Sequence, residues 1–322
     1  MQAWYQKAAP KFETKISKSL IHPFVVKGKD NGLTINPYQG CQHRCGYCYA
    51  TYIWSPEFFD KIYAKSNASE LLENELKTWK HEMIDPVMVS SATDPYQPAE
   101  LKYGLTQKCI KVLQSYGVPY YVFTKSSLIL RDLELHEKYK DNCFIVWSVT
   151  TCNEKIRRLI EPGTPPAASM FKVIKKFIDA GVCCGVNIDP ILPLITDSKE
   201  EIELILDSCV RAGIKHVFGA VLRLRDDIWQ RMRTILKSLD LKVGIDEYQK
   251  IYQFTEPLKM GYNLAANQVY SGEVMHDLQE KILERGMFHC FPDHMKTKTI
   301  ERRFVSANNG VHSQQLTLLK YL

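Results

Sequence analysis

Residues 40–50 read GCQHRCGYCYA and place three cysteines, Cys41, Cys45 and Cys48, within eight positions. The residues between them are Gln, His, Arg, Gly and Tyr, so this is not the apolar face on which a buried structural cysteine usually lies. Clustered thiols in a reducing compartment more often bind a metal or perform chemistry. The C-x3-C-x2-C spacing therefore predicts a metal centre.

Two metal centres fit this spacing to different degrees. Zinc would take the three cysteines together with His43, but structural zinc normally uses two ligand pairs that are well separated in the sequence. A four-iron cluster takes one thiolate per iron, so three thiolates leave one iron without a protein ligand. An open coordination position is where a metal centre performs chemistry. The spacing favours a catalytic iron–sulfur cluster.

Composition indicates the cellular compartment and the class of protein in which this metal centre is expected. The chain has 322 residues, 45% of them hydrophobic, and its ten cysteines are too sparse and too unevenly spaced for a disulfide scaffold. Its first residues, MQAWYQKAAPKFETK, lack the apolar run of a signal peptide, and no stretch reaches the roughly 18 apolar residues of a membrane span. We expect a cytoplasmic protein without a membrane partner. The net charge of +6 permits a nucleic-acid partner without demonstrating one.

Six short apolar runs, rich in Val, Ile, Tyr and Phe, are typical of strands that are covered on both faces. They span residues 33–38, 87–91, 120–124, 144–149, 182–188 and 216–222. Helical patterns at 105–117, 168–180 and 200–213 separate some of these runs, and a glycine ends each pattern.

Strands alternating with helices predict a parallel sheet of βα units. We expect a partial (β/α)6 barrel, with an open doubly wound sheet as the alternative. In both folds the functional loops follow the carboxyl ends of the strands, and the cysteines follow the first strand.

The alternation of strands and helices ends at about residue 224. We therefore expect the chain to have three parts. These are an N-terminal lead-in (1–30), a core barrel (31–223) and a helical or irregular extension that covers the barrel (224–322). The arginines of residues 223–233 are interpreted as a solvated helix face, with phosphate contact as the alternative.

A C-x3-C-x2-C loop after a first barrel strand resembles the radical S-adenosylmethionine (SAM) superfamily. The resemblance implies that Cys41, Cys45 and Cys48 hold a [4Fe-4S] cluster whose open iron is chelated by SAM. An external one-electron donor of the flavodoxin or ferredoxin type would reduce the cluster. The reduced cluster would cleave SAM to methionine and a 5′-deoxyadenosyl radical, which abstracts a hydrogen atom from substrate.

Further segments resemble one branch of that superfamily, the spore photoproduct lyase-like proteins. Within residues 33–222 these segments are NPYQGCQHRCGYCYA, SSATDPYQPAE, TKSS, WSVTT, LIEPGTPPAASMFKVIKKFIDAGV and IDPILPLITD. The resemblance, together with the position of polar residues after strands, implies SAM-binding roles. The residues concerned are Asp94, Lys125, Ser148, Thr150, Glu161 and Asn187.

Four of these residues also have a simpler interpretation. Asp94 could begin an Asp-Pro turn, and Lys125 could be a solvated loop lysine. Glu161 could fix its own loop, and Asn187 could be a satisfied core residue.

The resemblance to the lyase itself breaks at one position. The lyase has a hydrogen-donating cysteine after its second strand, and Ser91 takes that place here. A hydroxyl is a poor hydrogen-atom donor. Tyr47 and Tyr49 match the tyrosines that flank the last cluster cysteine of the lyase, so they are candidate catalytic residues or packing groups. Cys290, beside His289 and His294, is a candidate substitute donor or metal ligand.

The sequence therefore predicts a radical SAM enzyme that acts on an unidentified substrate. One alternative is a DNA lesion lyase of the spore photoproduct type that uses Cys290 as its donor. Another is a non-catalytic iron–sulfur protein that binds nucleic acid, whose affinity would depend on salt.

Overall fold

The computed structural model describes residues 9–26, 29–51, 57–79, 85–241, 244–261 and 263–295. Its larger sheet has seven strands in the order β10-β9-β8-β7-β6-β3-β2. The six strands from β10 to β3 run parallel, and β2 pairs antiparallel with β3 at the edge. The strands are β2 (Ile21–Val26), β3 (Lys29–Ile35), β6 (Val87–Val89), β7 (Tyr120–Thr124), β8 (Cys143–Ser148), β9 (Cys184–Ile191) and β10 (His216–Val221).

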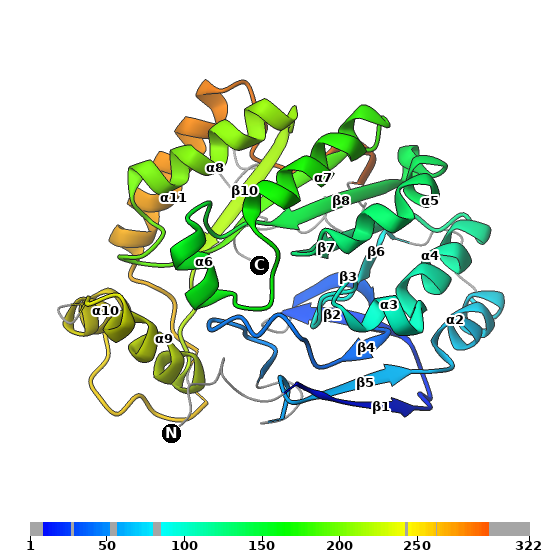
Figure 1. Cartoon of the computed structure of the whole chain (residues 1–322), viewed down its shortest axis with the longest axis horizontal. Helices are drawn as coiled ribbons and strands as arrows, with labels where there is room; N and C mark the ends of the chain where they lie inside the picture. The colour runs from blue at the N-terminus through cyan, green and yellow to red at the C-terminus, as the bar shows by residue number, and fades with distance from the viewer. Residues whose placement is uncertain are drawn as a thin grey trace.

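Helices follow most of the parallel strands and cover the outer face of the sheet (Figure 1). They are α2 (Ala68–Lys77), α3 (Ala99–Tyr103), α4 (Leu105–Ser115), α5 (Leu133–Glu137), α6 (Glu154–Ile160), α7 (Ala167–Asp179) and α8 (Lys199–Ala212). Short 3-10 helices η1 (Leu128–Asp132) and η2 (Lys140–Asn142) flank α5. Six parallel strands with helices on the outer face confirm the expected partial (β/α)6 arrangement.

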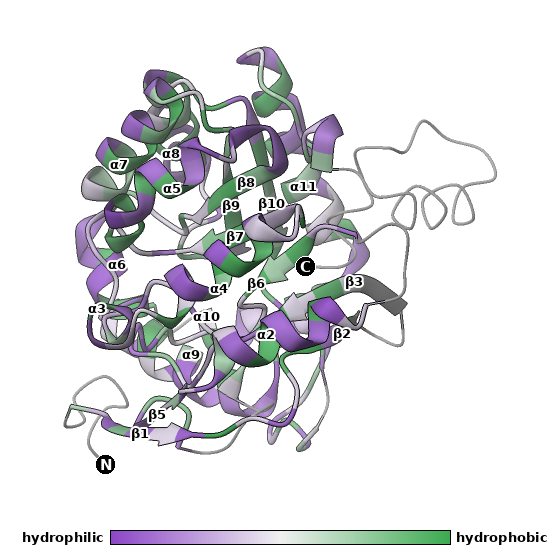
Figure 2. Ribbon diagram, turned by 90° about the vertical axis from the view of Figure 1, so that its right-hand side faces the viewer, coloured by the Kyte–Doolittle hydropathy of each residue, from purple (hydrophilic) through white to green (hydrophobic). Residues whose placement is uncertain are grey.

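Both faces of the parallel strands are buried, which explains their continuous apolar runs. In β8, Ile145 and Trp147 belong to the core beneath the outer helices. Phe144 and Val146, which alternate with them, belong to an aromatic cluster on the inner face. Side chains of a strand alternate between faces, so an apolar residue at each successive position serves one face or the other. Figure 2 shows this hydrophobic colouring along the central strands.

The N-terminal part, expected to be only a lead-in, contributes strands to both sheets. Strand β1 (Lys11–Lys15) pairs parallel with β5 (Lys61–Lys65), and β5 pairs antiparallel with β4 (Tyr38–Gln39), forming a second, three-stranded sheet. The expected strand 33–38 is thus shared between the two sheets, and the expected boundary at residue 30 falls within β3.

The C-terminal helices are α9 (Asp226–Ser238), α10 (Gly244–Tyr252) and α11 (Gln268–Glu284), followed by the 3-10 helix η3 (Asp293–Met295). Helix α11 packs on β10 and α8, whereas α9 and α10 lie together at another edge of the molecule (Figure 1). Residues 296–322 of the expected extension lie outside the described residues. No helix in the described ranges has both the length and the apolar character that a membrane crossing demands.

Candidate active site at the cysteine loop

The cysteine loop, residues 40–51, follows β3 and β4 at the carboxyl ends of the parallel strands. Three backbone contacts fix it from different directions: Gln97 Nε2 donates to Gly40 O (3.0 Å), Cys41 N donates to Phe58 O (3.2 Å) and Gly46 N donates to Ile160 O (2.8 Å). Gly40 has φ +85°, and a Cβ there would lie 2.3 Å from the Lys61 carbonyl oxygen. The loop therefore requires glycine at its start.

The three loop cysteines are free thiols, with Cys41 and Cys45 buried and Cys48 half-buried. Burial is the largest cause that raises the pKa of each thiol, and the neighbouring thiols raise the pKa of Cys41 and of Cys45 further. Metal ligands must be deprotonated, so metal binding would release these protons. Three thiols near one another on a fixed loop suit a four-iron cluster.

His43 lies inside the loop but is not available as a ligand. Its Nδ1 is 3.0 Å from the Gly163 carbonyl oxygen, and its Nε2 is 3.1 Å from Asp94 Oδ2. Burial alone would lower the pKa of His43, but the Asp94 carboxylate and these contacts raise it overall. Both ring nitrogens face acceptors within the protein, so the zinc interpretation loses its fourth ligand.

Asp94 connects three parts of the site. Its Oδ1 accepts hydrogen bonds from Tyr96 N and Thr124 Oγ1, both at 2.8 Å, and its Oδ2 accepts one from Lys125 N at 2.7 Å. The same Oδ2 faces His43. Burial would raise the pKa of Asp94, but the nearby imidazole and the hydrogen bonds lower it overall. Both oxygens are thus engaged within the protein, and Asp94 joins the cysteine loop to the end of β7.

Lys125 follows β7 and lies in a buried polar cluster with Glu161, Thr150 and Tyr47. Its Nζ is 3.0 Å from Glu161 Oε1 and 3.3 Å from both Thr150 Oγ1 and the Ser148 carbonyl oxygen. The Tyr47 hydroxyl donates to Glu161 and lies 3.0 Å from Thr150 Oγ1. These contacts bring five of the predicted site residues, counting Ser148 through its carbonyl oxygen, together beside Cys45.

The ion pair between Lys125 and Glu161 is internal to the protein. Burial would lower the pKa of Lys125, but the charge of Glu161 raises it; burial would raise the pKa of Glu161, but Lys125 lowers it. Only 12% of the Lys125 side chain and 1% of the Glu161 side chain are exposed. Lys125 is therefore not a solvated loop lysine.

Asn187 lies opposite Ser148 in the register of β8 and β9. Its Oδ1 is buried and, within the described part of the chain, has no hydrogen-bond partner. Its Nδ2 is 3.5 Å from Asp189 Oδ2. An unsatisfied acceptor at the carboxyl end of a strand is suited to a polar group of a ligand.

Asp189 is a site residue that the sequence reasoning missed. Burial raises the pKa of its carboxyl group to about 6, against the opposing effect of Lys125. Its position two residues after Asn187 in β9 was the available signal, because alternate residues of a strand face the same side.

The two tyrosines of the loop have different surroundings. Tyr47 is buried in the Lys125 cluster, whereas Tyr49 is half-exposed and its hydroxyl donates to the Ser91 carbonyl oxygen. The Ser91 hydroxyl accepts from Asn36 Nδ2 at 3.3 Å. The structure thus places Tyr49 beside Ser91, at the position where the resemblance put the lyase's hydrogen donor.

Cys290 lies far along the strands from this site, which corrects its interpretation as a donor. His216, the first residue of β10, has its Nδ1 2.9 Å from the Cys290 carbonyl oxygen. His294 Nε2 is 3.3 Å from the carbonyl oxygen of Cys143, the first residue of β8. Cys290 and its histidine neighbours therefore lie at the amino-terminal ends of the strands, whereas the cysteine loop lies at the carboxyl ends.

Arg231 corrects another expectation, because it is not on a solvated helix face. This residue of α9 has a side chain only 13% exposed. Its Nε donates to the Gly46 carbonyl oxygen at 2.7 Å, and its Nη2 donates to the Cys48 carbonyl oxygen at 3.3 Å. No sequence pattern marks this contact, which joins residues 185 positions apart.

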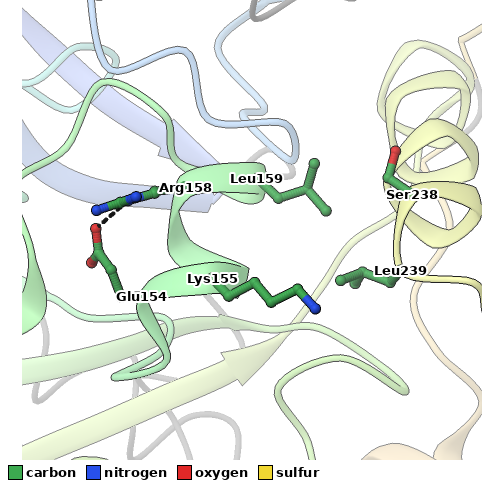
Figure 3. Close-up of a pocket in the computed structure, with 6 residues that line it drawn as sticks. All are labelled: Glu154, Lys155, Arg158, Leu159, Ser238 and Leu239. Carbon is green, nitrogen blue, oxygen red and sulfur yellow. Dashed lines mark hydrogen bonds and ion pairs between the residues drawn. The ribbon is translucent and has the colours of Figure 1, made fainter.

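A hollow of about 510 Å³ lies between α6 and the end of α9 (Figure 3). Its lining residues are Glu154, Lys155, Arg158, Leu159, Ser238 and Leu239. Arg158 Nε is paired with Glu154 at 2.9 Å. None of the predicted site residues lines this hollow, so it is separate from the site around the cysteine loop.

Comparison with known proteins places the chain in a family. The family model of the radical SAM superfamily matches residues 35–209, more than half of the chain. The uncharacterized protein ORF301 of Acidianus two-tailed virus is 30% identical over 244 residues, which cover 68% of this chain and 79% of that protein. The uncharacterized protein Rv2578c of Mycobacterium tuberculosis is 33% identical over 203 residues. That match spans 59% of the length of each protein.

Solved structures show the same fold at low sequence identity. A spore photoproduct lyase variant superposes with a TM-score of 0.65 at 13% identity, covering 89% of this chain and 88% of the lyase chain. Another variant, solved with bound AdoMet and a dinucleoside spore photoproduct, has a TM-score of 0.63 at 12% identity over the same shares. The superfamily is defined by a [4Fe-4S] cluster and SAM, and the match covers the cysteine loop that would hold the cluster. This chain belongs to the radical SAM superfamily.

Proposed function

We propose that the protein is a radical SAM enzyme whose [4Fe-4S] cluster is held by Cys41, Cys45 and Cys48. The observation that carries this proposal is the loop itself. Three free thiols lie on one fixed segment, while the fourth candidate ligand, His43, is engaged by Asp94 and Gly163. This arrangement supplies three protein ligands and leaves one coordination position open, as the proposed chemistry requires.

When bound, the cluster supplies the electron that cleaves SAM reductively into methionine and a 5′-deoxyadenosyl radical, which abstracts a substrate hydrogen atom. The chain's own residues would bind and orient SAM. The positive charge of Lys125, whose Nζ already contacts Ser148, Thr150 and Glu161, would favour a carboxylate nearby. The free Oδ1 of Asn187 offers an acceptor for an N–H or O–H group. Ser148 and Thr150 line the same strand end.

Two other residues would act by holding these groups in place. Glu161 keeps Lys125 charged and positioned, and Asp94 fixes the backbone of Lys125 and the imidazole of His43. Because both oxygens of Asp94 already have partners, we assign it a positioning role rather than direct contact with SAM.

The substrate is proposed to differ from the thymine lesion of spore photoproduct lyase. By the sequence resemblance, Ser91 stands at the donor position of the lyase. Cys290 lies at the opposite ends of the strands. A small metabolite, a peptide or a nucleic acid would enter at the carboxyl ends of the strands. The proposed electron source is an external carrier of the flavodoxin or ferredoxin type.

The test is 5′-deoxyadenosine formation by protein reconstituted anaerobically with iron and sulfide, reduced with dithionite and given SAM. A triple Cys41→Ala, Cys45→Ala, Cys48→Ala variant should hold no four-iron cluster and form no product. A matched control carries serine at three half-buried cysteines outside the loop, Cys152, Cys183 and Cys290. The control should keep both cluster and product.

Loss of product in the control but not in the loop variant would contradict the assignment. Wild-type protein that retains zinc and no iron would contradict it as well. Salt-dependent nucleic-acid binding by an iron-loaded protein that never cleaves SAM would favour the non-catalytic alternative instead.

A further inference from the structure

Arg231 of α9 contacts the backbone of the cysteine loop directly. Its guanidinium donates to two loop carbonyl oxygens, those of Gly46 and Cys48, at 2.7 and 3.3 Å. It also donates to Thr51 Oγ1 at 3.2 Å, and the Thr51 hydroxyl lies 2.9 Å from the Cys48 carbonyl oxygen. One side chain from α9 therefore binds the loop directly and through Thr51.

The orientation of Arg231 is fixed by further contacts on α9 and beyond. Asp227, one helical turn earlier, has its Oδ2 3.0 Å from Arg231 Nη2 and 2.6 Å from Thr51 Oγ1. The guanidinium carbon lies 5.9 Å from the centre of the Phe59 ring, over its face. A guanidinium is charged at every relevant pH and is well suited to several acceptors in a fixed geometry.

A partly buried positive charge beside the Cys48 carbonyl oxygen has an electrostatic consequence. Adding one electron to an iron–sulfur cluster adds one negative charge, which a nearby cation stabilises. Hydrogen bonds, net charge and solvent exposure around the thiolates are the means by which a protein sets the potential of such a cluster. The Asp227 carboxylate opposes the effect of Arg231 because it carries the opposite charge at a similar place.

We propose that Arg231 is a positioning residue for the cluster. It holds the Gly46–Cys48 backbone and makes the cluster easier to reduce. The opposite charge of Asp227 sets how large this effect on reduction is. The inference rests on the proposed function, since it concerns the same cluster. It gives the C-terminal helices a role in the one-electron step, in which the cluster gains one electron from the external carrier.

The experiment is an anaerobic redox titration of the reconstituted full-length protein, with dithionite as reductant and the reduced cluster followed by electron paramagnetic resonance. Arg231→Met should move the midpoint potential to a more negative value. Asp227→Asn should move it to a less negative value. Arg231→Lys keeps the charge but loses the forked geometry, so its potential should stay near that of wild type while iron is lost faster to a chelator.

The matched control is Arg233→Met, because Arg233 lies on the same helix but pairs with Glu256 at 3.3 Å. It should keep the wild-type potential and the wild-type rate of iron loss. The opposite directions expected for Arg231→Met and Asp227→Asn distinguish an electrostatic role from general damage to the fold.

Unchanged potentials in iron-loaded Arg231→Met and Asp227→Asn would overturn the inference while leaving the proposed function intact. If Arg231→Met does not fold, Asp227→Asn and Arg231→Lys decide the matter by the same criteria. Wild-type protein that binds no four-iron cluster would instead be a failure of the proposed function, and it would be seen before any variant is titrated.

Discussion

At the scale of single residues, the site is organised around charged groups that lie inside the protein. Lys125 and Glu161 form a buried ion pair, and Asp94 and His43 form another. A buried pair is costly to break because the remaining charge is left without its partner. These residues therefore support the fold as well as the proposed chemistry.

Glu161→Gln should lower the free energy of unfolding by about 3–5 kcal/mol at pH 7, because it leaves Lys125 buried without a counter-charge. Lys125 and the Tyr47 hydrogen bond outweigh burial and lower the pKa of Glu161. An acid whose folded pKa is lowered stabilises the protein above its unfolded pKa, and this contribution is lost as the pH falls. The difference between wild type and variant should therefore shrink in acid, as measured by urea unfolding at several pH values.

Glu73→Gln is the matched control for that measurement. Glu73 lies on α2 and pairs with Lys77 at 2.8 Å, but 44% of its side chain and 54% of the Lys77 side chain are exposed. An exposed pair of this kind contributes about 1 kcal/mol or less. Equal losses of unfolding free energy in the two variants would contradict the view that burial makes the Lys125–Glu161 pair costlier to break than an exposed pair.

Much of the site could be predicted from sequence because its residues follow strand ends within recognisable segments. Cys41, Lys125 and Thr150 lie where those segments place them. The pairing of His43 with Asp94 could not be foreseen, since it depends on how two loops approach each other in space. The same holds for Arg231, whose helix carries no motif that distinguishes it from a solvated one.

At the scale of elements, the cysteine loop and the α6–α7 connection are packed without space between their backbones. Gly163 N donates to His43 O at 3.0 Å, and the Gly163 carbonyl oxygen lies 3.0 Å from His43 Nδ1. A Cβ at Gly163 would lie 2.3 Å from the Gln42 carbonyl oxygen. The two segments can approach this closely only because residue 163 has no side chain.

Gly163→Ala should displace the cysteine loop, lower the free energy of unfolding by about 1–3 kcal/mol and speed the loss of iron after reconstitution. Thermal unfolding and iron analysis would measure both effects. Gly272→Ala is the control, since a Cβ there meets nothing within 4 Å in α11. Alanine favours a helix interior by up to about 1 kcal/mol, so this control should be neutral or stabilising. A Gly163→Ala protein as stable and as iron-retentive as wild type would contradict the close packing.

The sequence predicted the strands that are buried on both faces and missed those that are not. Strands β7 and β10 begin at the expected residues, because an unbroken apolar run is a strong signal. Strand β1, KFETK, has four exposed residues, so neither a run nor an alternation marks it. The second sheet, which contains β1, therefore went unpredicted.

At the scale of the whole molecule, the C-terminal part packs against the rest of the protein at two separate places. Helices α9 and α10 share a core with Cys45 and Tyr47 at the carboxyl ends of the strands. Residues 288–295 return to the opposite ends, where Phe291 and Met295 join the inner aromatic cluster with Phe144 and Phe218. The described C-terminal residues thus pack near both ends of the strands. The three-part division of the chain stays a prediction.

Phe291→Ala should cost about 3–5 kcal/mol of stability, the range for a large buried side chain. The Phe291 ring lies 5.1 Å from the Phe144 ring and 5.2 Å from the Phe218 ring, measured between centroids. Phe288→Ala should cost far less, because Phe288 is 50% exposed. SAM cleavage per loaded cluster should be unchanged in both, since the site lies at the other ends of the strands. Denaturant unfolding with parallel activity assays would check this, and an activity loss without a stability loss would contradict it.

The aromatic filling of the inner face also bears on the order of events in a catalytic cycle. Because these rings fill the inner face toward the amino-terminal ends of the strands, we expect SAM and substrate to enter and leave at the carboxyl ends. For the proposed reaction, the ligand that binds last must then leave first, because it lies across the path of the ligand bound deeper. A bulky substrate would then hold the nucleoside fragment in place until it had itself departed, which would protect a reactive intermediate from water.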